Sequence, residues 1–179
     1  FFFVIVVSFI FKKRYRESNS WSKNNSFNWP NAEVVLCLKG ADENLFSLLK
    51  SLSNQIYLGT WQLQIIIDSD EDPSCKIGEN FQDTQLNHAL NKPSWQKLTI
   101  SFLNDRPKEG SLKCASLLKA FNNLNNDSSI IALVDADSSV SNDWLSNLVM
   151  SCSQTGVGAV SGNRWYICKS NNMGAWIRS

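Results

Sequence analysis

Short apolar runs alternate with apolar residues at helical spacing along most of this chain. The runs are rich in β-branched residues and predict strands over 34–38, 61–67, 97–103, 130–134 and 157–160. Helical spacing predicts helices over about 42–55, 111–124 and 143–150, and a less regular helix over 73–90. Strands that alternate with helices predict an α/β fold, a three-layer sandwich whose mostly parallel sheet is covered on both faces.

Two details of the helices are predicted from the same pattern. Asp42 is expected to be the N-cap of the first helix, and Asp143 or Asn142 that of the last. In the helix over 111–124, the apolar residues that recur at helical spacing are Leu112, Ala115, Leu118 and Phe121.

The strand at 130–134 is followed by two carboxylates, Asp135 and Asp137. In extended backbone, residues two apart point the same way, so both would face one point beyond the strand. Mg²⁺ and similar cations prefer oxygen ligands and are often held by one or two carboxylates plus substrate phosphates. The pattern suggests a metal that bridges the protein to a diphosphate. The alternative is that Asp137 only begins a turn, which Ser138 and Ser139 continue.

A second acidic cluster, Asp68 to Pro73, follows the strand at 61–67. The carboxyl ends of parallel strands lie at one edge of a sheet, and ligands of open α/β sheets bind outside that edge. We therefore expect both acidic clusters to face the same crevice.

Composition narrows the function classes. The 179 residues suffice for one domain with a real core, and a formal charge of +1 gives no basic field for nucleic acid. Five cysteines without a Cys-x-x-Cys pair favour buried free thiols over zinc or a disulfide framework. A single histidine, His88, in an Asn-rich stretch argues against a catalytic triad or a multi-histidine metal site.

The N-terminal region has a different character. Residues 1–11 are apolar except for Ser8 and run into Lys12-Lys13-Arg14-Tyr15-Arg16. Eleven residues are too few for a span of about 20, but an apolar run that ends in basic residues resembles the last half of a transmembrane helix with its cytoplasmic flank. A core strand and a signal-peptide remnant are the alternatives. We expect 1–16 to be an anchor, 17–31 a Ser- and Asn-rich linker and 32–179 the catalytic region, on the cytoplasmic side of a membrane.

Several motifs, taken in order, resemble one enzyme family. They are Lys39-Gly40-Ala41-Asp42 after the first strand, the acidic loop ending in Asp72-Pro73, Gly110-Ser111-Leu112-Lys113, the Asp-x-Asp pair, a Trp-Leu helix and Gly-Val-Gly-Ala-Val. Over about residues 30–166 they resemble ceramide-glucosyltransferase-like enzymes, which are family-2-type inverting glycosyltransferases with a GT-A fold.

The resemblance implies a function and roles for particular residues. It implies a membrane-anchored hexosyltransferase that moves a sugar from a UDP-sugar to a lipid acceptor. Mg²⁺ or Mn²⁺ would be held by Asp135 and Asp137. Donor contacts would come from Lys39, Asp68, Asp70, Lys113 and Asp135, with Asp68, or an acid just after it, near the uridine. The alternatives without a functional role are polar turns for the acids and solvated side chains for the lysines.

The sequence also departs from this family. Ala115 and Ser116 stand where the family has asparagines, no Asp or Glu occurs after Asp143, and Ser161 stands where a Gln-x-x-Arg-Trp motif would need glutamine. Inverting transfer needs a general base, so no catalytic residue can be assigned and we expect the base beyond Ser179. The expectation is that the chain is the nucleotide-sugar-binding part of a longer enzyme, and that it binds a nucleotide without efficient turnover.

Three other interpretations stay open. A non-catalytic nucleotide-sugar-binding module, or an inactive fragment, fits the missing base equally well. A haloacid-dehalogenase-like phosphatase shares a strand followed by Asp-x-Asp, but that family places the motif early and needs later acidic residues. A nucleotidyltransferase would need a Gly-rich basic loop, of which Lys39-Gly40 is too little.

Overall fold

The computed structural model describes residues 27–76, 81, 94–104 and 110–163. The expected anchor (1–16), most of the linker and most of the expected helix over 73–90 lie outside these residues, as do His88 and Cys168. No helix in the described ranges is long and apolar enough to cross a bilayer.

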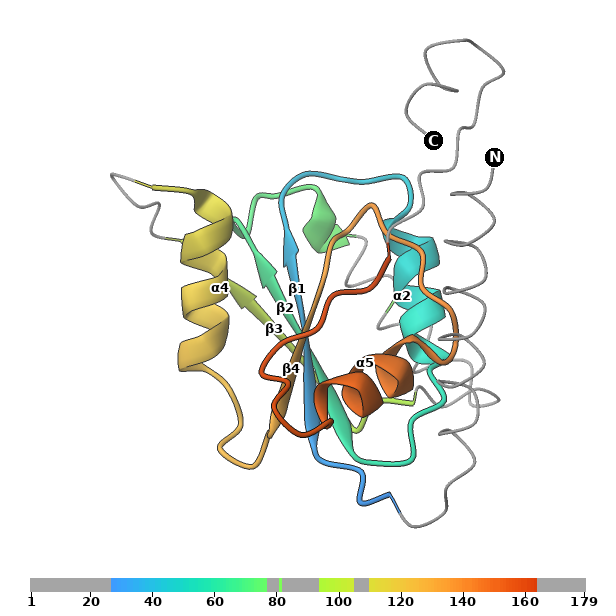
Figure 1. Cartoon of the computed structure of the whole chain (residues 1–179). Coiled ribbons are helices and arrows are strands. Elements are labelled where there is room, and N and C mark those ends of the chain that lie inside the picture. Colours follow the sequence, from blue (N-terminus) through green and yellow to red (C-terminus); the bar gives the residue numbers. More distant parts are fainter. Residues whose placement is uncertain (1–26, 77–80, 82–93, 105–109, 164–179) are drawn as a thin grey trace, which may run out of the picture.

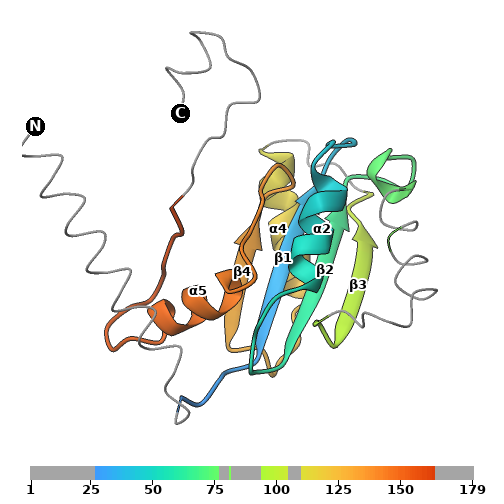
Figure 2. The same cartoon turned by 90° about the vertical axis from the view of Figure 1, so that its right-hand side faces the viewer.

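Four parallel strands form one sheet in the order β3-β2-β1-β4 (Figure 1 and Figure 2). The strands are β1 (Ala32–Leu38), β2 (Trp61–Ile67), β3 (Lys97–Phe102) and β4 (Ile130–Val134). Central β1 pairs with β2 and β4, so that Leu36 lies between Ile65 and Val134. Because all strands run the same way, their carboxyl ends share one edge, at the top of Figure 2. The four predicted strands up to β4 are confirmed.

Helices lie on both faces of the sheet (Figure 1). α2 (Leu45–Ser53) and α5 (Trp144–Cys152) cover one face, and α4 (Leu112–Asn122) covers the other. The main core lies on the α2 and α5 side, where Leu36, Leu45 and Leu49 are almost fully buried. The predicted α/β fold is therefore confirmed. Apolar strands that are buried on both faces of a sheet need a layer of helices on each face.

The first helix begins later than predicted. Its N-cap is Asn44, and Asp42 instead accepts a hydrogen bond from the Asn44 backbone N–H at 2.7 Å. An aspartate that bonds the N–H two residues on forms an Asx-turn, which competes with the capping geometry. Asp42 as N-cap was wrong, whereas Asp143 is the N-cap of α5 as predicted.

The sheet-facing side of α4 is formed by small residues. Its buried residues are Ser116 and Ala120, while Leu118 is 63% and Phe121 42% exposed. Ala120 packs with Val35 and Ile66 of the central strands. The small side chains of Ser116 and Ala120 allow the helix to approach the sheet closely. The larger side chains of Leu118 and Phe121 lie on the exposed side of the helix.

The structure has no fifth strand at 157–160. Val157 to Asn163 has no regular structure, and Val160 is 37% exposed. A strand needs a neighbour for its backbone hydrogen bonds, and among the described residues β4 pairs only with β1. Coverage is also incomplete at β4, where Ile131 and Leu133 are 41% and 51% exposed.

Candidate functional site

The carboxyl edge of the sheet gathers most of the predicted site residues. Lys39 directly follows β1, Asp68 follows β2 and Asp135 follows β4. Since β1 lies between β2 and β4, the two acidic clusters lie on either side of Lys39. The expectation that both clusters share one edge follows directly from this topology.

Asp135 forms an ion pair with Lys113. The Lys113 ammonium, in the first turn of α4, donates to Oδ1 of Asp135. The side chains of Lys113 and Asp135 are 59% and 36% exposed. The α4 helix thus begins at the edge where β4 ends, and two residues predicted to contact the donor lie in direct contact.

Asp137 lies in a turn and not in extended backbone. The backbone N–H of Ser138 donates to the carbonyl oxygen of Asp135 at 3.1 Å, which closes a turn around Ala136 and Asp137. The argument that extended backbone aims both carboxylates at one point was therefore wrong. A turn at Asp137 was the alternative interpretation. In this turn the Asp137 side chain is exposed, two residues after Asp135.

Cys37 belongs to the same corner and was missed as a neighbour of the site. Leu36 pairs with Val134, so the next residues along the two strands are Cys37 and Asp135. Burial raises the pKa of the Cys37 thiol, Lys113 opposes the rise and Asp135 adds to it. The register of β1 and β4 was the signal that could have placed it there. The described cysteines are all free thiols, but they are only partly buried or, for Cys114, exposed.

Asp68 is held deep at the end of β2. It is 5% exposed, its N–H donates to the Leu38 carbonyl at 3.2 Å and its carbonyl accepts from the Asn104 N–H at 3.3 Å. These bonds continue the strand pairing by one residue on both sides of β2. By contrast, Asp70 and Lys39 have exposed side chains.

Asp72 connects the acidic loop to the loop after β1. The Gly40 N–H donates to its two carboxylate oxygens at 3.1 and 2.9 Å, and the Ser74 N–H and hydroxyl donate to Oδ1 at 2.9 and 2.6 Å. Burial would raise the Asp72 pKa, but these hydrogen bonds and the charge of Lys39 outweigh it and lower the pKa. Gly40 has φ +77°, which a glycine adopts without strain.

A family model for glycosyl transferases matches most of the chain. The match is to "Glycosyl transferase family 2" over residues 33–178. The chain belongs to glycosyl transferase family 2. The described site lies wholly within the matched residues, and this membership agrees with the glycosyltransferase resemblance of the motifs, at the level of the family.

Solved structures of other proteins share the fold of this family 2 chain. A mannosyltransferase, PcManGT from Pyrobaculum calidifontis in complex with GDP-Man and Mn²⁺, has a TM-score of 0.54 at 16% identity, covering 79% of this chain and 39% of that one. TarS 1–349 of S. aureus gives 0.51 at 16% identity, covering 78% and 40%. The predicted GT-A-like fold is confirmed. The chain spans about 40% of the length of these neighbours, and no curated protein matches it significantly.

The residues at the carboxyl edge of the family 2 chain suit a hard divalent cation. Asp135 and Asp137 offer oxygen ligands, and Asp135 already binds a positive charge. No group of three or more His, Cys, Asp or Glu side chains gathers within the described residues. Two carboxylates with the remaining ligands from water and phosphate oxygens are typical of Mg²⁺ sites.

A cavity of about 170 Å³ lies elsewhere, at the amino ends of the strands. Its lining is mainly polar and includes Asn31, Thr60, Gln62, Gln96 and Asp127. Ligands of open α/β sheets bind beyond the carboxyl ends. The cavity is therefore on the wrong edge for the site described above.

Proposed function

We propose that this family 2 chain binds the nucleotide-sugar donor of a membrane-anchored, inverting, metal-dependent hexosyltransferase. The observation that carries the proposal is the contact between Lys113 and Asp135 at the carboxyl edge of the sheet. It joins a cationic and an anionic group where a metal diphosphate would need both. Family membership and the Mn²⁺ and GDP-Man in the PcManGT structure support a nucleotide-sugar and a divalent cation.

Asp135 and Asp137 are the proposed metal ligands. Mg²⁺ or Mn²⁺ bound there would supply positive charge that stabilises the leaving nucleoside diphosphate. Lys113 would contribute a further positive charge next to the same phosphates. Lys39 has an exposed ammonium at the same edge, from which it would contact the donor.

The nucleoside is proposed to bind near the end of β2. Asp68 is fixed there by its backbone bonds to both neighbouring strands, and Asp70 lies exposed in the following turn. Hydroxyl or imide N–H groups of a nucleoside donate to carboxylates of this kind. UDP is proposed as the nucleotide because the motifs resemble ceramide-glucosyltransferase-like enzymes.

The acceptor is proposed to be a membrane lipid. The apolar run at 1–11 followed by basic residues supports an anchor that would hold the site near the cytoplasmic face of a bilayer. The proposed partners are therefore a UDP-sugar, a lipid acceptor and the membrane, without nucleic acid. Residues 1–16, 17–31 and 32–179 are the proposed anchor, linker and catalytic region.

A non-catalytic nucleotide-sugar-binding module is the second candidate. It is favoured by the lack of any Asp or Glu after Asp143, since inverting transfer needs a base to accept the acceptor's proton. Both candidates require donor binding at the same edge, and they differ only in turnover.

Calorimetric titration of UDP, with and without Mn²⁺, tests the proposal. We expect UDP to bind only in the presence of the metal. A variant with both Asp135→Ala and Asp137→Ala should lose that binding. Asp127→Ala is the matched control, because Asp127 is an exposed carboxylate at the amino edge. Equal binding by all three proteins would refute a donor site at this edge.

A further inference from the structure

The position of Lys113 in its helix is electrostatically unfavourable. It is the second residue of α4, whose first turn holds no acidic residue. The N-terminus of a helix carries a partial positive charge, so a cation there is destabilising unless an anion compensates it. Asp135 supplies that anion from the end of β4.

The Asp135 carboxylate is also the group proposed to bind the metal. A carboxylate oxygen that accepts a lysine ammonium offers fewer lone pairs to a divalent cation. An exposed ion pair contributes little to stability, so a divalent cation can displace the lysine at small cost. With Lys113 and Asp135 both substantially exposed, the ammonium can swing away without breaking the core.

We infer that Lys113 is an internal counter-ion which occupies Asp135 until a divalent cation displaces it, and which then contacts the diphosphate that the cation carries. This inference rests on the proposed function. Lys113 opposes metal binding when the nucleotide is absent and favours nucleotide binding when the metal is present. A lysine with only a structural role would not change the two affinities in opposite directions.

The first test uses Mn²⁺ alone, with free Mn²⁺ measured by electron paramagnetic resonance during titration of the full chain. Lys113→Met should lower the Kd for Mn²⁺ by about two- to fivefold at low salt, the range expected for loss of one exposed ion pair. Lys113→Arg keeps the charge and the pairing, so its Kd should stay near that of the wild type. Asp135→Ala should remove the binding.

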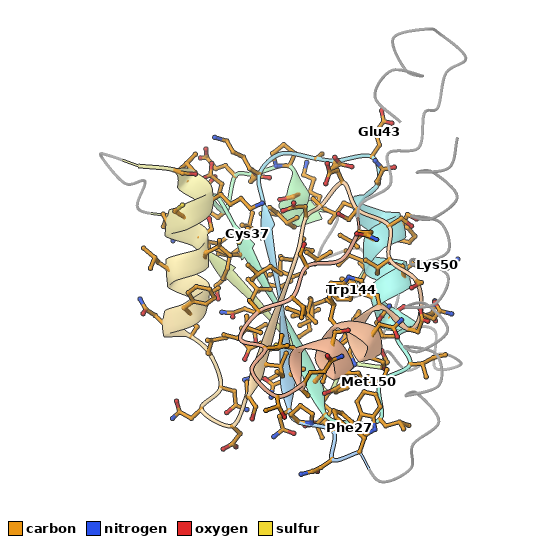
Figure 3. All side chains as sticks on the ribbon, viewed as in Figure 1. Phe27, Cys37, Glu43, Lys50, Trp144 and Met150 are labelled. Atoms are coloured by element: carbon orange, nitrogen blue, oxygen red, sulfur yellow. The ribbon has the colours of Figure 1, made fainter. Side chains whose placement is uncertain are left out.

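Two lysine controls separate the contact from general charge. Lys39→Met removes the same charge at the same edge, and Lys50→Met removes it on α2, on the far side of the sheet from α4 (Figure 3). Neither should lower the Kd as far as Lys113→Met. If Lys39→Met matches it, repulsion through space explains the effect and the inference is wrong.

A second measurement observes the lysine directly. Titration with diamagnetic Mg²⁺ should move the ammonium ¹H–¹⁵N signal of Lys113, assigned by its loss in Lys113→Met, towards that of a solvated lysine. The displacement of Lys113 would be refuted if its ammonium signal did not move while Mg²⁺ saturated a site that depends on Asp135. Absence of any Asp135-dependent metal binding in wild type and Lys113→Met would overturn the metal site and this inference together.

The last arm adds UDP at saturating Mn²⁺, where Lys113→Met should weaken UDP binding by about tenfold, the loss of one charge-assisted contact to phosphate. Unchanged UDP binding would refute the second role of Lys113. If the Mn²⁺ effects appear but the wild type binds no nucleotide, the donor proposal fails while the counter-ion role stands.

Discussion

At the scale of single residues, Asp72 joins two loops of the carboxyl edge. It accepts hydrogen bonds from Gly40 and Ser74, 32 and 2 residues away in sequence. Its nearly buried carboxylate therefore fixes the loop that carries Lys39 against the loop that carries Asp70. This makes Asp72 a stabilising residue of the proposed donor site.

Asp72→Ala should lower the free energy of unfolding by about 1–3 kcal/mol, because it leaves the buried Ser74 donors and the partly buried Gly40 N–H without their acceptor. Urea denaturation measures the change. Asp70→Ala is the matched control, since Asp70 is exposed in the same loop and should change stability by less than about 0.5 kcal/mol. Equal effects of the two substitutions would contradict the role given to Asp72.

The contribution of Asp72 should also depend on pH. Its pKa is lowered in the folded protein, so the unfolded chain binds its proton more readily than the folded one. The stabilisation is fully present above the unfolded pKa of about 3.9 and is lost as pH falls through the lower folded pKa. The difference in unfolding free energy between wild type and Asp72→Ala should therefore shrink below about pH 4. A difference that widens in acid would show that the sign is wrong.

At this scale the sequence predicts which acidic residues reach the carboxyl edge better than it predicts the turns and loop contacts that hold them. Asp68 and Asp135 reach one edge because each directly follows a parallel strand. The turn at Asp137 depends on a local hydrogen bond from Ser138, and the contact of Asp72 with Gly40 depends on loops far apart in sequence. The turn could be predicted only as an alternative, from its turn-forming residues. The contact of Asp72 with Gly40 produces no periodic pattern, so it could not be predicted.

At the scale of elements, α4 determines where Lys113 lies. The helix contacts the sheet through Ala120, which is fully buried against Val35 and Ile66. Spacing of three and four residues predicted the helix but not the side that faces the sheet, because small residues carry little hydrophobic signal. The strands, by contrast, were predicted from their uninterrupted apolar runs, which a sheet buried on two faces requires.

Two substitutions in α4 test its orientation. Ala120→Leu should lower the free energy of unfolding by about 1–3 kcal/mol, because the larger side chain overpacks the space between helix and sheet. Leu118→Ala should change it by less than about 0.5 kcal/mol, since Leu118 is mostly exposed. Thermal or urea unfolding gives both values. The opposite ranking would mean that the apolar stripe faces the sheet after all.

At the scale of the whole molecule, the described residues form one parallel sheet between two layers of helices. The chain spans about 40% of the length of its two structural neighbours. Its edge strand β4 exposes Ile131 and Leu133. In the proposal, the carboxyl edge of this sheet binds the nucleotide-sugar donor. Sugar transfer also needs a general base, so the chain can bind the donor without transferring the sugar.

We predict that donor binding exceeds turnover in this chain. The chain should bind UDP with Mn²⁺ but release little free UDP from UDP-sugars in the presence of lipid acceptors, because no acidic residue follows Asp143 to serve as base. A coupled assay of UDP release, run beside the calorimetry, compares the two. Rapid transfer by this chain would refute this prediction.

A crystal structure of the chain with UDP and Mn²⁺, measured for manganese anomalous scattering, would locate the donor site without relying on variants. We expect an anomalous peak beside Asp135 and Asp137, with the diphosphate on its far side and Lys113 turned from Asp135 to a phosphate oxygen. Nucleotide bound at the amino edge, in the cavity lined by Asn31 and Gln62, or manganese bound away from Asp135, would contradict a donor site at the carboxyl edge.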